Sequence, residues 1–140
     1  MELRSGIKLL AEIEGYGDPI VDNDRYDAVL KFYRNKGEPL LMQTMPLEPI
    51  PKIVELDGKA VIGWDAPGFV ESHIVIERGR ALSRGADVLP GIYYSILGMR
   101  TAGYRYVAIP PHLFAHTMHE GLGIDKESVI KMECFLTSIR

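Results

Sequence analysis

Three histidines and a glutamate lie close together in the segment HLFAHTMHEG, near the end of the chain. His112, His116 and His119 fall at positions i, i+4 and i+7, and Glu120 follows the last of them. On a continuous helix these imidazoles would share one face, and imidazole is a common ligand of zinc and nickel. Two prolines before the segment and two glycines after it oppose such a helix, so the favoured alternative is a loop of exposed or loosely packed histidines without a metal.

The other reactive side chains match no known catalytic or nucleotide-binding pattern. Cys134 is the only cysteine, which excludes an intrachain disulfide and a multi-cysteine zinc site, and its place in an alternating pattern predicts a core residue. His73 follows Glu71 and Ser72, but no nucleophile-elbow sequence surrounds them. The glycines of GYGDP and GLGID lack the spacing of a phosphate-binding loop. We therefore expect no cofactor.

Length and composition predict a single globular domain over residues 1–140. The chain is 46% hydrophobic and 25% charged, with a net charge of -3 that is spread without blocks of one sign. This distribution favours a neutral or peptide-like ligand over nucleic acid or an anionic membrane surface. The first residues contain neither a signal peptide nor a membrane span, so the expected location is the cytoplasm.

Alternating apolar residues and turn sequences predict a mainly β structure. Strands are expected over 7–13, 26–33, 104–109 and 128–139, and KIVEL and KAVIGW form a hairpin around Asp57-Gly58, the dipeptide of a type I′ turn. In the second strand, Ala28, Leu30 and Phe32 are expected to face the core, while Asp27 and Lys31 face water.

One segment, DVLPGIYYSILGM, has the features of a short helix. Leu89, Ile92 and Ile96 recur at near-helical spacing, Pro90 suits a first turn, and Gly98 suits the exit. Many strands with a single helix predict an α+β domain in which an antiparallel sheet wraps the helix.

From Val88 onward the chain contains, in order, VLPGIYYSILGM, the turn GMRTAGYR, the segment IPPHLFAH, a glycine-containing flap HEGLGI and the strand SVIKMECFLTSI. The order and the spacing resemble the FKBP-type peptidyl-prolyl isomerases, and the N-terminal SGIKLLAEIEGYGDP segment resembles the opening of that family. The resemblance implies a curved sheet of about five antiparallel strands around one short helix, with the ligand pocket between them.

Residues 42–79 depart from a minimal member of the family. This inserted β-rich segment contains the Asp57-Gly58 hairpin, the single tryptophan, Trp64, and the run HIVIER. It is interpreted either as a platform for a partner or as an enlarged bulge that extends the sheet, and we favour the bulge.

Carried over residue by residue, the resemblance implies an apolar pocket. It places Phe32, Val88, Leu89, Ile92, Ile124 and Met132 at catalytic pocket positions, and Leu40, Phe114, Ala115 and His116 at neighbouring ligand-binding positions. A prolyl bond rotates over a barrier of ~18–20 kcal/mol, and an apolar pocket lowers it by excluding water and preferring the twisted amide. Neither a nucleophile nor a metal is required.

Several of these positions differ from the family pattern. Ile92 replaces the tryptophan of the pocket floor, and Met132 replaces a phenylalanine. Leu40 and Leu41 lie where a phenylalanine followed by an anchoring aspartate is usual, so the aspartate is missing. Ala115 replaces the flap tyrosine, unless Phe114 takes that place after a slip of one residue. The resulting hypothesis is an isomerase of reduced activity that acts on proline-containing peptides or proteins. The alternative is a non-catalytic module that binds peptides or a partner.

Overall fold

The computed structural model describes residues 3–38, 43–44, 46–68, 70–71, 73–83, 88–114, 119 and 123–140. The strands are β1 (Lys8–Ile13), β2 (Arg25–Tyr33), β3 (Gln43–Thr44), β4 (Ile50–Leu56), β5 (Lys59–Asp65), β6 (Val70–Glu71), β7 (His73–Ala81), β8 (Gly103–Ile109) and β9 (Ile130–Ile139). The helical elements with bounds inside these described residues are α1 (Pro90–Ile96) and the 3-10 turns η1 (Arg4–Gly6) and η2 (Pro111–Leu113). In this described part, no helix has the length and apolar character needed to cross a bilayer.

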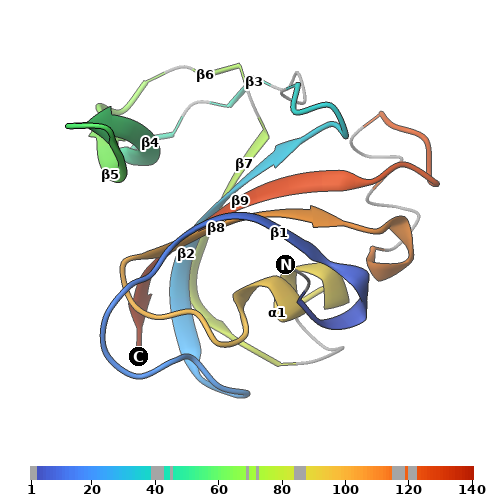
Figure 1. The fold of residues 1–140 in the computed structure, drawn as a ribbon, viewed down its shortest axis with the longest axis horizontal. Coiled ribbons are helices and arrows are strands. Elements are labelled where there is room, and N and C mark those ends of the chain that lie inside the picture. Colours follow the sequence, from blue (N-terminus) through green and yellow to red (C-terminus); the bar gives the residue numbers. More distant parts are fainter. Residues whose placement is uncertain are drawn as a thin grey trace.

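Five strands form one antiparallel sheet in the order β1-β8-β9-β2-β7. Figure 1 shows this sheet curving around α1, which lies on its concave side. The prediction of a curved antiparallel sheet around one short helix is thus confirmed. The run HIVIER, assigned from the sequence to the inserted segment, lies in β7, the edge strand that pairs with β2.

The concave face and α1 enclose the main core. Alternate residues of β2, namely Ala28, Leu30 and Phe32, point into it, as the pattern predicted. From β9 come Met132, Cys134 and Leu136, so the prediction that Cys134 is a core residue is confirmed. The core therefore forms where the inward-facing residues of the sheet meet one face of the helix.

The convex face of the sheet carries a second core, because the β4–β5 hairpin covers it. Asp57 and Gly58 both have positive φ, 52° and 77°, which confirms the predicted two-residue turn. Ile50 of the hairpin is buried in a cluster with Val29 and Phe135 of the sheet. Figure 1 shows the hairpin on the opposite side of the sheet from α1.

The expectation that Asp27 and Lys31 face water was wrong. Asp27 is only 9% exposed and Lys31 is half-buried, with its ammonium 5.2 Å from the ring centroid of Phe135. The strand pattern did show two faces, but the apolar hairpin from elsewhere in the chain packs on the second one, and Gly79, Ser138 and Arg140 contact Asp27 there. A carboxylate this buried needs hydrogen bonds from its surroundings.

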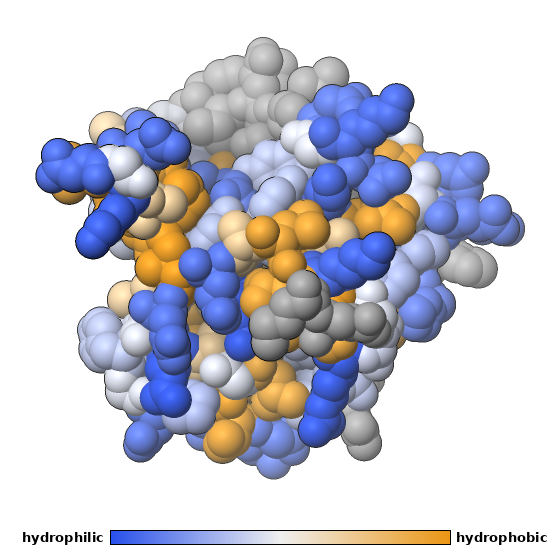
Figure 2. Space-filling model, in the orientation of Figure 1, coloured by the Kyte–Doolittle hydropathy of each residue, from blue (hydrophilic) through white to orange (hydrophobic). Residues whose placement is uncertain are grey.

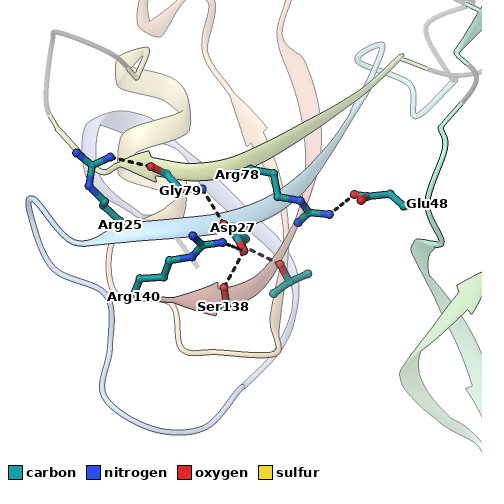
Figure 3. A network of polar contacts seen from close by, with 8 residues as sticks. Arg25, Asp27, Glu48, Arg78, Gly79, Ser138 and Arg140 are labelled. Carbon is teal, nitrogen blue, oxygen red and sulfur yellow. Dashed lines mark hydrogen bonds and ion pairs between the residues drawn. The ribbon is translucent and has the colours of Figure 1, made fainter.

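Asp27 receives those hydrogen bonds from β7, from β9 and from Arg140, which directly follows β9. Gly79 N–H donates to one carboxylate oxygen over 2.7 Å, and Ser138 and Arg140 donate to the other over 3.1 and 2.7 Å. In Figure 3 these groups converge on Asp27, and Arg78 reaches from β7 to Glu48 in the segment before the hairpin. The contacts of Asp27 join β2 to β7 and to the end of β9, and the Arg78–Glu48 contact ties β7 to the segment before the hairpin.

Candidate functional site

The floor of the candidate pocket is a row of side chains across the concave face. Phe32 on β2 pairs with Met132 on β9, which pairs in turn with Val107 on β8. All three are at most 1% exposed. The register of the sheet thus places two of the predicted pocket residues side by side, although they are far apart in the sequence.

Helix α1 closes over this row, and its first turn is held very near to β8. A Cβ atom at Gly91 would lie 2.8 Å from Ile109 Cγ2 and 3.2 Å from Phe114 Cζ, so only glycine fits there without movement. Pro90 occupies the first helical position, where its missing N–H does no harm. This close approach brings Ile92 of the helix and Phe114 into the same core cluster.

Two polar side chains fix the helix over the sheet. Arg105 of β8 donates from Nη1 to the carbonyl oxygens of Ser95 and Leu97, over 2.8 and 3.0 Å, and from Nε to Glu12 over 3.0 Å. A cation at the C-terminal end of a helix satisfies its free carbonyl groups and complements its dipole. Tyr93 donates to Asp22 over 2.7 Å. The helix is therefore anchored at its last turn, away from the pocket residues of its first turn.

The predicted site residues that the structure describes all lie in or against this one cluster. Phe32, Val88, Ile92, Phe114 and Met132 are buried members, whereas Leu89 and Ile124 are partly buried and pack against it. Leu89 immediately precedes α1 and Ile124 is the last residue of the flap, and both are partly exposed at the border of the cluster. Leu40, Ala115 and His116 lie outside the described residues.

The histidine segment is not one continuous helix. His112 lies in the 3-10 turn η2 and is exposed, and Phe114 directly after it is extended. His119 is fully buried, so the expectation of an exposed or loosely packed side chain was wrong for this residue. Its Nε2–H donates to the carbonyl oxygen of Ser128 over 3.0 Å, and its ring meets Phe114 edge-on with centroids 6.1 Å apart.

The backbone of His119 also contacts Ile124, whose N–H donates to the His119 carbonyl oxygen over 3.1 Å. The Nδ1 atom of His119 is buried without a hydrogen-bond partner. Within the described residues, no group of three or more potential metal ligands comes together.

His73 is a site residue that the sequence analysis missed. It lies opposite Phe32 in the β2–β7 register, and the two ring centroids are 5.4 Å apart. Burial lowers the pKa of His73, which favours the neutral ring. Its position follows only from pairing HIVIER with β2, which the local pattern could not reveal.

The cluster offers hydrophobic contact and exclusion of water. Its side chains are aliphatic, aromatic or sulfur-containing, apart from the neighbouring His73, and none of them is an activated nucleophile. Burial raises the pKa of the Cys134 thiol to about 12, which keeps it protonated. The chemistry of the cluster is therefore limited to hydrophobic contact and exclusion of water, and it makes no covalent bond.

Comparisons of structures support this architecture, whereas comparisons of sequences find no match. No protein family model matches the sequence, and neither does any curated protein. The crystal structure of AtFKBP13 matches with a TM-score of 0.59 and 17% identity, over 99% of this chain and 97% of that one. The chain has the FKBP fold.

A second FKBP-like match is consistent with the first. The crystal structure of FkpA from Escherichia coli superposes with a TM-score of 0.54 and 15% identity, over 100% of this chain and 51% of FkpA. In this FKBP-like fold, the cluster between α1 and the concave face occupies the place where the sequence resemblance put the pocket. At these identities the likeness concerns the fold, and activity has to be argued from the residues themselves.

Proposed function

We propose that this protein is a peptidyl-prolyl cis-trans isomerase acting on X-Pro bonds of peptides or proteins. The observation that carries the proposal is the single apolar cluster formed by the described pocket residues between α1 and the concave face of an FKBP-like sheet. Leu89 and Ile124 at its rim are the positions at which a proline ring would first make contact. Proline-containing segments of other proteins are the proposed partners.

A site of this kind catalyses rotation by binding the twisted amide more tightly than the planar amide. The planar amide is stabilised by a polar resonance form that water solvates, and the twisted amide lacks much of that polarity. A water-excluding apolar site therefore binds the twisted state better than the planar one, which lowers the barrier to rotation. No bond other than the rotating one changes, so the absence of an activated nucleophile from the cluster is compatible with the reaction.

The substitutions in the pocket favour a slow enzyme. Ile92 and Met132 keep the floor apolar but do not supply flat aromatic walls, whereas Phe32 and Phe114 still do. Aromatic rings offer a large rigid contact surface to a proline ring. We expect the reduced aromatic surface to weaken binding of the twisted state and to leave the mechanism unchanged.

A second candidate function is non-catalytic peptide binding on the same fold. The observation that favours it is the burial of Phe32 and Met132, at 1% and 0% exposure, because a floor this closed leaves a proline ring only the rim residues to contact. A module of this kind would bind a proline-containing segment without accelerating its isomerisation.

A protease-coupled isomerisation assay on short X-Pro peptides separates the two. We expect the wild-type protein to accelerate isomerisation and Leu89→Asp to lose about tenfold or more of that activity, because the variant puts a charge at the rim of a desolvating site. Leu10→Asp makes the same change at a side chain that is 45% exposed on β1, and it should retain full activity. A folded wild-type protein that accelerates none of the peptides would exclude the isomerase and leave the binding module.

A further inference from the structure

A groove on the convex side of the sheet, remote from the proposed isomerase site, has the features of a peptide-binding surface. It lies between β5 of the hairpin and the sheet, with a volume of about 410 Å³, within the range of ~300–1,000 Å³ usual for ligand pockets. The hairpin lines it with Ala60, Val61, Ile62 and Trp64. Figure 2 shows apolar surface gathered between the hairpin and the body of the molecule.

The lining of the groove is uncharged. On the sheet side it is formed mainly by Ile13, Phe135 and Leu136, and neither wall contributes an aspartate, glutamate, lysine or arginine. Trp64 at its border is 57% exposed, which is unusual for so large an apolar side chain. A ligand for this groove must therefore be apolar and without net charge where it makes contact.

The edge of β5 borders the groove along its length. Successive side chains of a strand point to opposite faces, yet the groove is lined by the consecutive residues Ala60, Val61 and Ile62. Because the groove contacts residues from both faces of β5, it must also contact the backbone edge of β5 that lies between those faces. Among the described strands, β5 pairs with β4 alone, so its other edge has no strand partner there.

The register of the hairpin shows which backbone groups this edge presents. The two residues that flank a two-residue turn, here Leu56 and Lys59, hydrogen-bond to each other through both N–H and C=O groups. From there, hydrogen-bonded pairs alternate with non-hydrogen-bonded pairs along the two strands. The N–H and C=O groups of Ala60, Ile62 and Trp64 consequently point away from β4. The same three residues line the groove, so the unpaired backbone groups and the apolar lining occur together.

We propose that an extended, apolar polypeptide segment of another protein binds here as a third strand beside β5, with alternate side chains in the groove. Regularly spaced donors and acceptors next to an apolar wall match the backbone and the side chains of an extended peptide. A small hydrocarbon ligand would fill the groove but leave the strand edge unpaired. The surface would hold unfolded segments independently of whether they contain proline.

The test uses Trp64, the only tryptophan in the chain, as an intrinsic probe. The wild-type protein is titrated with a short soluble peptide of alternating valine and threonine that has lysine at each end and contains no proline. We expect a saturable blue shift of tryptophan emission as Trp64 becomes buried. Leu47→Ser, at a 90% exposed residue outside the groove lining, should bind the peptide as the wild type does.

Two variants separate strand pairing from general hydrophobic contact. Ala60→Pro removes one outward N–H that the β4 ladder does not use, and we expect about tenfold weaker binding with the hairpin retained. Ile62→Thr keeps a β-branched residue but removes apolar lining, and it should also weaken binding. Unchanged emission in the wild type, or binding as tight as that of the wild type by either variant, would overturn the proposal. So would self-association through this edge without peptide, since the occupant would then be a second copy of the chain.

Discussion

Cys134 shows how burial controls the chemistry of a single residue. It lies in the middle of β9 with no exposure, and burial raises its pKa to about 12. Because the thiolate is the reactive form, we predict negligible reaction with a thiol reagent in the native state and rapid reaction after unfolding in urea. A disulfide-exchange dye read by absorbance measures both. Rapid labelling of the native protein would contradict the description of β9 as a core strand.

Asp27 is the residue from which we predict a pH dependence of stability. Burial acts to raise its pKa, but hydrogen bonds from Gly79, Arg140 and Ser138 outweigh burial, so the pKa is lower than usual. A lowered folded-state pKa means that ionised Asp27 stabilises the fold above about pH 4, the unfolded value, and that this contribution is lost as the pH falls through the folded pKa.

Asp27→Asn should therefore lower the free energy of unfolding at neutral pH by about 1–3 kcal/mol, with a difference that shrinks below about pH 4. Urea unfolding at a series of pH values measures this. Glu48→Gln removes an exposed partner of Arg78 and should cost at most about 1 kcal/mol. An effect of Asp27→Asn that is constant down to acid pH would refute the role assigned to the carboxylate.

At the scale of elements, the position of α1 depends on a residue without a side chain. Alanine is a better helix former than glycine by about 1 kcal/mol, yet Gly91→Ala would place a methyl group 2.8 Å from Ile109 Cγ2. We predict that this variant is destabilised by about 1–3 kcal/mol, because the helix must move away from β8. Gly68→Ala is the control, since a Cβ there meets nothing within 4 Å. Thermal unfolding compares them, and a Gly91→Ala variant as stable as wild type would show that the contact is loose.

The sequence predicted the elements that depend on neighbouring residues, and it did not predict which other elements pack against them. The Asp57-Gly58 turn, the helix beginning at Pro90 and the inward face of β2 follow from residues next to one another in the chain. The burial of Asp27 and the pairing of His73 with Phe32 depend on segments distant in sequence. Strand periodicity shows that a strand has two faces, but it does not show what covers each.

For the candidate site, the structure shows which of the predicted residues lie together, and their role in binding or catalysis stays a prediction. The resemblance to FKBP-type isomerases selected seven described residues that gather in or against one cluster, although no single spacing relates them. It could not show that His119 is buried against Phe114 or that His73 adjoins Phe32, because both depend on tertiary contacts of this chain.

For the molecule as a whole, the sheet separates two apolar regions with different proposed uses. The concave cluster under α1 is the proposed isomerase site, and the groove beside β5 is the proposed site for extended segments. Ligands that differ only in proline should distinguish them. A proline-containing peptide is expected to contact Leu89 and Ile124, and a proline-free strand is expected to contact Ala60 and Trp64.

The most direct test of the central claim is exchange NMR on an X-Pro peptide with a catalytic amount of the protein. The account predicts that cis-trans exchange cross-peaks of the peptide intensify with the wild-type protein and with Leu10→Asp, and weaken markedly with Leu89→Asp. Exchange that stays at the uncatalysed rate with a folded wild-type protein, or that is unaffected by Leu89→Asp, would contradict the assignment of the concave cluster as an isomerase site.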